Sequence, residues 1–420
     1  MTNEDRGAGG LRARGYETLG RRAPAIGVAS LLAASVAWVT ATQRIPQSAD
    51  QAIVGLMGLH ILEGRGHPVF YWGSTYGGSL EAHLVAAAFA LFGSSAAAYR
   101  GVMVLLTAAV VLSIWALARA FGERKAASFT AAYLALPPFF FLYKVLTSDG
   151  HYASAVLVAA GIVASALSYH ARAGEGRSLA APAGALGLVG GIGLWVTPLF
   201  LPVFVAAATW LGATEARRLR LRPIVALALG FVAGSFPWWF WNARHGWASL
   251  SAPEAAGATA PRLLQNVVDL FRTALPILLG AASPHAPPPS PWLRAGALLL
   301  AAVVLALSLR RLLRGSAFDA LLLWVLLVIG AASVLPARFD PLEPRFLTTG
   351  YVALAPLFGA AVCDLQRSGR LGRLAAVAFV AATAALHVQG LVSARRHLGV
   401  VPGSSSVTGP LDASGRAPVC

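Results

Sequence analysis

The chain has 420 residues, of which 57% are hydrophobic and only 12% are charged, and its formal net charge is +16. Soluble domains carry about 25% charged residues, so this composition excludes an ordinary water-soluble enzyme. The high hydrophobic content also excludes intrinsic disorder. The composition predicts an all-α, polytopic membrane protein, with a single integral membrane domain over residues 1–391.

Apolar segments long enough to cross a bilayer occur throughout the chain. A hydrocarbon core about 30 Å thick requires about 20 apolar residues per helix. The sequence therefore predicts about eleven transmembrane spans, at 24–42, 97–120, 126–143, 151–171, 179–196, 198–213, 223–241, 292–309, 317–335, 346–364 and 374–391. The first segment lacks a small-residue cleavage site and predicts a retained span. The Gly-, Ser- and Pro-rich end, 392–420, predicts a flexible outer tail.

Positive charge indicates how the helices are oriented. With the N-terminus placed in the cytoplasm, 20 of the 33 Lys and Arg residues fall in short cytoplasmic segments, as the positive-inside rule requires. The apolar segment 79–93 is short and begins with polar residues, so it predicts an interfacial or re-entrant helix. Counting it as a span would move the cluster Arg217–Arg222 to the outside. The charge therefore indicates cell-membrane topology rather than nucleic-acid binding, and leaves two large outer loops at about 43–96 and 242–291.

Several familiar kinds of site are missing from the sequence. The two cysteines, Cys363 and Cys420, provide neither a disulfide framework nor thiolate metal ligands. The chain has no P-loop, GxSxG elbow, HExxH motif or Rossmann fingerprint, so a soluble nucleotide donor has no recognisable binding motif. In a chain with so few charges, large outer loops are where function is expected.

The first outer loop opens with a predicted helix. Ser48 and Gln51 fit a capping box, which places Asp50 in the first helical turn. Apolar residues then follow at the spacing typical of a helix lying on a membrane surface: Ile53, Val54, Met57 and Ile61. Asp50 would face away from the lipid, where it either complements the helix dipole or acts as a general base on a hydroxyl group.

Glycines and aromatic residues alternate in the next part of this loop. Trp72 and Tyr76 are candidates for stacking on a sugar, and the alternative is that they anchor the loop at the bilayer interface. Glu81 begins the predicted interfacial helix. It is either a second catalytic acid or a plain acid in a first helical turn.

Lys144, Asp149 and His151 cluster at the outer ends of two consecutive predicted spans. Ionisable residues at membrane depth are costly, so such a cluster predicts a functional site. Asp50, Asp149 and His151 also offer ligand types that suit a divalent cation, although their spacing is not specific for one. The sequence predicts no other cofactor.

Two arginines lie near later spans on the predicted outer side. Arg244 follows the tryptophan-rich segment FPWWFWN, which predicts an aromatic belt at the outer face. Arg345 precedes a predicted span. It either snorkels to the interface or binds a lipid phosphate, for which the planar guanidinium group is well suited.

The order of these features resembles the GT-C superfamily of polyprenyl-phosphate-sugar glycosyltransferases, which includes protein O-mannosyltransferases and lipid A aminoarabinose transferases. The matching stretches are SADQAIVGLMGLHILEGRGHPVFYWGSTYGGSLEAHLVAAAFALFGSSAAAYRG, TSDGHY, FPWWFWNARHG and EPRFLTTGYVALAP. The resemblance implies that Asp50 is the catalytic base, that Asp149 is a second acid and that Arg345 lies near the lipid phosphate. This chain has Gln51 where the family usually has Glu, and Gly-Gly-Ser-Leu at 77–80 where many members have Lys-Pro-Pro-Leu.

The sequence thus predicts a multi-pass inner-membrane glycosyltransferase with its N-terminus in the cytoplasm and its active site on the outer face. It would transfer a sugar from a polyprenyl-phosphate-linked donor to a hydroxyl group of a glycan, lipid or protein. The predicted catalytic residues are Asp50, Asp149 and Glu81, and the predicted substrate-binding residues are Lys144, His151, Arg244, Arg345, Tyr76 and Trp72.

Two other classes of function remain open at this stage. A transporter or flippase for lipid-linked sugars predicts acids at mid-membrane depth and two related halves. A polysaccharide polymerase or ligase would share the lipid-linked substrate, but it should centre on a different large outer loop.

Overall fold

The computed structural model describes residues 49–147, 151–218, 220–250, 259–284, 286–336 and 339–397. Regular structure within these ranges is helical, apart from one isolated β-bridge between Phe70 and Gly78. The all-α prediction is therefore confirmed. The first predicted span, 24–42, lies outside the described residues.

Helices occupy each of the other predicted spans. They are α4 (Ala96–Phe121), α5 (Arg124–Ala135), α6 (Phe139–Leu146), α7 (Tyr152–Gly174), α8 (Ala180–Val196), η1 (Pro198–Phe200), α9 (Leu201–Glu215), α10 (Leu221–Gly234), α11 (Phe236–Arg244), α14 (Pro291–Leu313), α15 (Ala317–Val334), η5 (Arg345–Gly350), α16 (Tyr351–Arg367) and α17 (Gly369–His397). The remaining helices are α2 (Ala49–Leu62), α3 (Leu80–Phe92), η2 (Ala216–Arg218), η3 (Ala248–Leu250), α12 (Ala260–Asp269), the π-helical η4 (Leu270–Ala274) and α13 (Leu275–Leu278). The last long helix, α17, ends six residues beyond the predicted span.

Seven helical segments of the described chain are long and apolar enough to cross a membrane. The number rises to nine if two bent pairs each count as one span: α5 with α6, bent by 76°, and α10 with α11, bent by 62°. The 17-residue α8 is a shorter apolar helix. The polytopic membrane fold is shown, whereas the total of eleven spans stays a prediction. A short helix is present at 79–93, as predicted, and its interfacial placement also stays a prediction.

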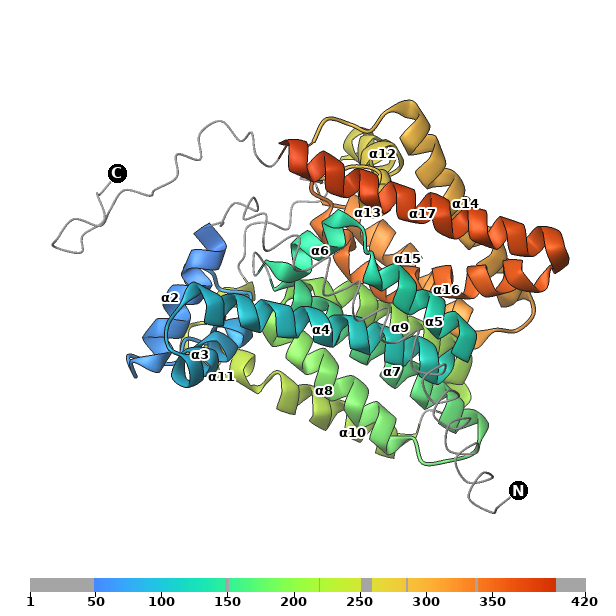
Figure 1. Ribbon diagram of the computed structural model, residues 1–420. Helices are drawn as coiled ribbons and strands as arrows, with labels where there is room; N and C mark the ends of the chain where they lie inside the picture. The colour runs from blue at the N-terminus through green and yellow to red at the C-terminus, as the bar shows by residue number, and fades with distance from the viewer. Residues whose placement is uncertain are drawn as a thin grey trace, which may run out of the picture.

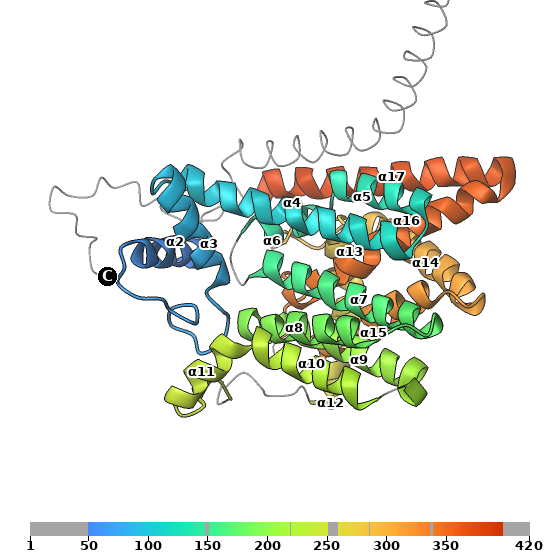
Figure 2. The ribbon, with the colours of Figure 1, turned by 90° about the horizontal axis from the view of Figure 1, so that it is seen from below.

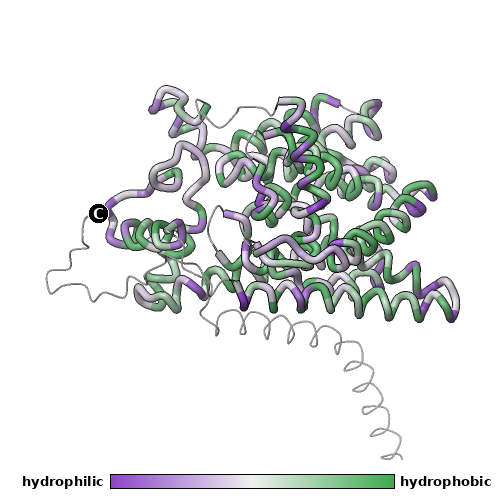
Figure 3. Tube along the Cα trace, turned by 90° about the horizontal axis from the view of Figure 1, so that it is seen from above, coloured by the Kyte–Doolittle hydropathy of each residue, from purple (hydrophilic) through white to green (hydrophobic). Residues whose placement is uncertain are grey.

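The long helices run side by side, so their termini and connecting segments gather at two opposite ends of the molecule (Figures 1 and 2). Helices α2, α3 and α11 gather at one end, which we call the loop end. The junctions that the sequence marks as Arg-rich, such as α4–α5 and α16–α17, lie at the opposite end, which we call the basic end (Figures 1 and 2). Figure 3 shows hydrophilic residues at the helix ends and largely hydrophobic residues along their length. This separation of charge from the bundle is what a bilayer-spanning chain requires.

The apolar stripe of α2 does not lie on a membrane surface. Val54 and Met57 are 1% and 0% exposed, and they pack in a cluster with Val85 of α3 and Met103 of α4. A Cβ atom at Gly58 would lie 2.7 Å from Val85 Cγ1, so the glycine permits this close approach. The predicted lipid-facing stripe is therefore wrong, because α2 and α3 bury their apolar residues against each other.

Helices α8 and α10 are held together by glycines. A Cβ atom at Gly187 would lie 2.0 Å from the Leu227 oxygen, and one at Gly191 would lie 2.2 Å from the Phe231 oxygen. On the facing helix, a Cβ atom at Gly234 would lie 2.2 Å from the Leu188 oxygen. Small residues at such spacing let two backbones approach closely, which is a common way to pack helices in membranes.

An ion-pair network joins three helices at the basic end. Arg311 of α14 donates to Asp319 of α15 at 2.8 Å and to Asp364 of α16 at 2.7 Å, and its side chain is only 12% exposed. Asp364 also lies 4.0 Å from Arg367, which in turn pairs with Glu123 at the start of α5. Acids at this end therefore pair with the cations that the sequence marks as cytoplasmic.

Replacing Arg311 by alanine is expected to destabilise the fold by about 3–5 kcal/mol, because two largely buried carboxylates would lose their charge partner. The exposed Arg314, one turn further along, supplies the matched control, and Arg314→Ala should change the unfolding free energy by less than about 0.5 kcal/mol. Denaturant unfolding in detergent micelles measures both variants. Equal stability of the two variants would show that the network contributes little.

Candidate active site

The loop end places Asp50 in the first turn of α2, where its side chain is half-buried. The Tyr71 hydroxyl donates a hydrogen bond of 2.8 Å to Asp50 Oδ1. A carboxylate in the first helical turn is stabilised by the helix dipole, and the Tyr71 bond fixes one of its two oxygens. The arrangement holds Asp50 as an oriented acceptor, which is what a general base requires.

The loop that carries Tyr71, residues 63–79, is attached to elements far away in the sequence. Trp195 Nε1 at the end of α8 donates to the Val69 oxygen at 2.9 Å, and the Gly78 amide donates to the Val196 oxygen at 2.9 Å. The Ser249 hydroxyl donates to the Thr75 oxygen at 2.6 Å. These bonds tie the loop to α8 and to the segment after α11.

Glu81 and His151 lie close to each other, and the His151 ring contacts Tyr71. Glu81 is 0% exposed, accepts a hydrogen bond from the Ser154 hydroxyl at 2.9 Å, and lies with its Oε2 atom 3.6 Å from His151 Nδ1. The His151 side chain is 6% exposed, and its ring centroid lies 6.1 Å from that of Tyr71, edge to face. We call Asp50, Tyr71, Glu81 and His151 the Asp50 cluster.

Lys144 is buried close to this cluster and is already engaged. Its side chain is 1% exposed, forms an ion pair with Glu343, and lies 5.0 Å and 4.8 Å from the rings of Tyr143 and Tyr152. The ion pair attaches the segment before η5 to α6, and the contact of Lys144 with the Tyr152 ring brings it close to the start of α7, where Tyr152 directly follows His151. Lys144 would have to exchange Glu343 for a substrate phosphate before binding it.

Replacing Glu343 by alanine is expected to destabilise the protein by about 3–5 kcal/mol, because Lys144 would remain buried without its carboxylate partner. Adding Lys144→Met removes the buried charge, so the double variant should recover much of the lost stability. Thermal unfolding of the purified single and double variants tests this. Equal losses in both variants would show that Glu343 acts through something other than Lys144.

The two predicted substrate-binding arginines are more accessible. Arg345 and Arg244 are both exposed. Arg345 begins η5, two residues after Glu343, and its guanidinium carbon lies 5.3 Å from the Phe346 ring centroid. Arg244 ends α11 and stacks over Phe240 at 3.9 Å. The Lys144–Glu343 pair therefore brings the Arg345 segment next to α6.

The predicted sugar-stacking residues remain accessible on the loop. Trp72 and Tyr76 are 39% and 42% exposed. Trp72 packs edge to face on His60, with ring centroids 5.2 Å apart, and His60 lies in the last turn of α2. Trp72 therefore lies at the end of α2 opposite to Asp50, whereas Tyr71 reaches Asp50 itself.

The predicted cation site is only partly described. Asp149 lies outside the described residues, and its catalytic and metal-binding roles stay predictions. Within the described ranges, no group of three or more His, Cys, Asp and Glu side chains has a geometry suited to a metal ion. A cation held by Asp50, Asp149 and His151 stays a prediction.

The chain matches no protein-family model and no curated protein sequence. Its structure is similar to that of ArnT from Cupriavidus metallidurans bound to undecaprenyl phosphate, with a TM-score of 0.58 and 13% identity over 89% of this chain and 77% of that chain. It is also similar to the oligosaccharyltransferase AglB from Archaeoglobus fulgidus in complex with an inhibitory peptide and a dolichol-phosphate. There the TM-score is 0.50, with 13% identity over 88% of this chain and 56% of that chain. Both proteins are GT-C glycosyltransferases.

The chain has the GT-C fold. It spans little more than half the length of the AglB chain, so the whole enzyme's activity is not transferred by this likeness. At 13% identity the comparison concerns the arrangement of helices. The predicted resemblance to GT-C proteins is thus confirmed at the level of the fold.

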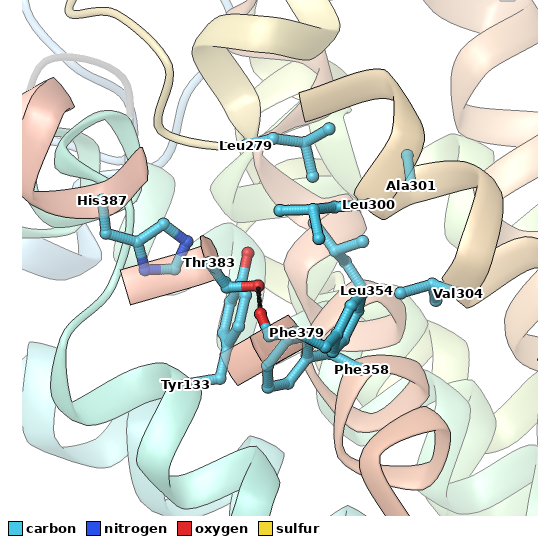
Figure 4. Close-up of a pocket in the computed structure, with 10 residues that line it drawn as sticks. All are labelled: Tyr133, Leu279, Leu300, Ala301, Val304, Leu354, Phe358, Phe379, Thr383 and His387. Carbon is cyan, nitrogen blue, oxygen red and sulfur yellow. Dashed lines mark hydrogen bonds between the residues drawn. The ribbon is translucent and has the colours of Figure 1, made fainter. Parts of the chain in front are cut away.

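The GT-C bundle also contains a small cavity of about 20 Å³ that shares no lining residue with the Asp50 cluster (Figure 4). It lies among α5, α14, α16 and α17 and is mostly apolar. Tyr133, Thr383 and His387 are the polar residues among those that line it, and the Thr383 hydroxyl donates to the Phe379 oxygen at 2.8 Å. This volume accommodates about one water molecule, which is too small for a sugar substrate.

Three residues of the site were not singled out from the sequence. Tyr71 is one of several aromatic residues that alternate with glycines in its loop, and Ser154 lies within an apolar span without any motif. Glu343 lies two residues before Arg345, but nothing in the sequence indicates its ion pair with Lys144, which is 199 residues away. Only Tyr71 has a local sequence signal, which is the group of glycines around it. The contacts of Ser154 and Glu343 depend on how distant helices pack.

Proposed function

We propose that this protein is a membrane glycosyltransferase that transfers a sugar from a polyprenyl-phosphate-linked donor to an acceptor hydroxyl group, with Asp50 as the general base. The observation that carries the proposal is the Asp50–Tyr71 hydrogen bond in a chain with the GT-C fold. The neighbour ArnT, bound to undecaprenyl phosphate, supports a lipid phosphate as part of the donor.

In this mechanism Asp50 takes the proton from the acceptor hydroxyl group while the hydroxyl oxygen attacks the anomeric carbon of the donor. The bond between that carbon and the phosphate oxygen breaks, and the polyprenyl phosphate leaves with the bonding electron pair. Tyr71 orients Asp50 for this step. The exposed Arg345 and Arg244 are proposed to bind the phosphate and stabilise its developing charge.

The remaining predicted residues have proposed supporting roles. His151 lies beside Tyr71 and is proposed to contact the substrate, while Trp72 and Tyr76 offer exposed aromatic faces to a sugar. Lys144 is proposed to contribute its charge after exchanging Glu343 for the phosphate. Asp149 remains a proposed second acid. The acceptor is proposed to be a glycan, a lipid or a protein.

The distribution of charge supports an enzyme with an outward-facing site. Among the described residues, each acidic side chain lies in the first or last turn of a helix or between helices. A transporter of lipid-linked sugars is expected to hold acids at mid-membrane depth instead. The Arg-rich junctions at the basic end support a cytoplasmic location for that end and an outer location for the Asp50 cluster, in one membrane domain over 1–391.

Transfer by the purified full-length protein tests the proposal. The protein would be reconstituted in lipid nanodiscs with a panel of synthetic polyprenyl-phosphate sugars and hydroxyl acceptors. Release of polyprenyl phosphate and formation of a glycosylated acceptor, both measured by mass spectrometry, are the expected results. Uptake of intact donor into sealed vesicles without its cleavage would instead identify a flippase.

A further inference from the structure

Two carboxylates at the loop end have different surroundings. Asp50 is half-buried in the first turn of α2, whereas Glu81 is fully enclosed between α3 and the start of α7. Burying a carboxylate is costly unless partners compensate for its lost hydration. The Ser154 hydroxyl donates a hydrogen bond to Glu81 Oε1. The Glu81 carboxylate also lies near the N-terminus of α7, where the helix dipole favours negative charge.

The other oxygen of Glu81 faces His151. Glu81 Oε2 and His151 Nδ1 are both buried and have no hydrogen-bond partner among the described residues, and they lie 3.6 Å apart. This distance is within ion-pair range, although it is longer than a hydrogen bond. An ionised carboxylate only accepts hydrogen bonds, so the arrangement favours a proton on Nδ1.

The backbone and the neighbouring loop fix where the imidazole lies. His151 has a φ of 60°, in the left-handed region that non-glycine residues rarely adopt, and it caps α7. A Cβ atom at Gly77 would lie 3.5 Å from its Cδ2 and Nε2 atoms. The Nδ1 edge of the ring therefore faces Glu81, and the Nε2 edge faces the loop that carries Tyr71.

We propose that Glu81 is a positioning residue, which holds the proton of His151 on Nδ1 and so presents an unprotonated Nε2 edge to the Asp50 side of the site. Glu81 then acts through His151 rather than touching the substrate. Carboxylates behind histidines fix the tautomer and the ring orientation in this way. The kinetic part of this inference rests on the proposed glycosyl transfer, whereas the tautomer does not.

The first test reads the histidine directly. Full-length protein labelled with ¹⁵N-histidine in lipid bilayers would be studied by solid-state NMR, and the His151 signals assigned by their loss in His151→Gln. The wild-type protein should show a protonated Nδ1 and an unprotonated Nε2. Glu81→Gln should shift the proton to Nε2 or give a mixture. Unchanged His151 signals in Glu81→Gln would overturn the proposal.

A second glutamate–histidine pair, between His170 of α7 and Glu215 of α9, supplies the matched control. His170 Nδ1 lies 2.7 Å from Glu215 Oε1 near the other end of α7. Glu215→Gln removes a buried carboxylate charge of the same kind, but it should leave the His151 signals unchanged. A change in those signals for Glu215→Gln would show that any loss of buried charge disturbs α7, which would also overturn the proposal.

Kinetics provide the second test. Glu81→Gln should lower kcat by about 10- to 100-fold with a smaller change in the donor KM, as expected for a group that orients another. In the His151→Ala protein, Glu81→Gln should lower kcat only slightly, because the histidine that Glu81 positions is absent. Equal losses in both backgrounds would overturn the proposal. If wild-type protein transfers no sugar but the tautomer responds to Glu81→Gln, glycosyl transfer is refuted and the positioning of His151 stands.

Discussion

Asp50→Asn is expected to lower the rate of sugar transfer by about 10²- to 10⁴-fold, the range that general bases contribute. Asparagine keeps the size and the hydrogen-bonding oxygen that Tyr71 contacts, but it cannot take up the proton of the acceptor hydroxyl group. The donor should still bind, so its KM should change much less than kcat. Initial rates with purified protein in nanodiscs measure both constants.

Glu63→Gln provides the matched control for this substitution. Glu63 follows the other end of α2, is exposed and pairs only with its neighbour Arg65 at 3.0 Å among the contacts described here. Neutralising it should leave the transfer rate nearly unchanged. If Asp50→Asn retains wild-type transfer while the thermal midpoint of both variants matches the wild type, Asp50 merely complements the helix dipole.

Gly191→Leu is expected to prevent normal packing of α8 on α10. The first added carbon atom would already lie 2.2 Å from the Phe231 oxygen, and the obstacle is backbone rather than a flexible side chain. Overpacking costs about 1–3 kcal/mol in ordinary cores, and a larger loss is expected here because two helix backbones must separate. Low yield of monodisperse protein in size-exclusion chromatography is the measured result.

Two alanine variants make this prediction sharper. Gly191→Ala introduces the same clash with the smallest possible side chain, whereas a Cβ atom at Gly212 of α9 meets nothing within 4 Å. Alanine is the better helix former, so Gly212→Ala should be neutral or slightly stabilising. A Gly191→Ala protein as stable as Gly212→Ala would contradict the close contact of the two helices.

Much of the helix arrangement could be predicted from the sequence, because bilayer thickness and helix rise fix how long an apolar segment must be. The positions of α4, α7, α14 and α15 follow from this single constraint. The bends between α5 and α6 and between α10 and α11 were not predicted, because each bent pair lies within one apolar segment that is long enough to be a single span. Pro137 and Pro138 mark the first of these breaks, and Ser235 marks the second.

The candidate site was predicted less completely. The position of Asp50 in a first helical turn follows from local capping chemistry, and α2 begins at Ala49 as expected. The predicted lipid contact of the apolar residues on α2 was wrong, because the spacing of apolar residues shows that a helix has an apolar face but not what covers that face. An apolar stripe at helical spacing is expected both for a helix that lies on a membrane and for a helix that packs on another helix such as α3.

The attachment of the loop at 63–79 also constrains how the protein is made. Its partners Trp195 and Ser249 lie 126 and 174 residues after the groups they bind, and Glu343 follows Lys144 by 199. Contacts between such distant parts of a chain cannot form until the later part has been synthesised and inserted. A nascent chain ending before Trp195 would contain Asp50 and Tyr71 but lack the residues that fasten their loop, so the loop end of this protein is completed late in its biogenesis.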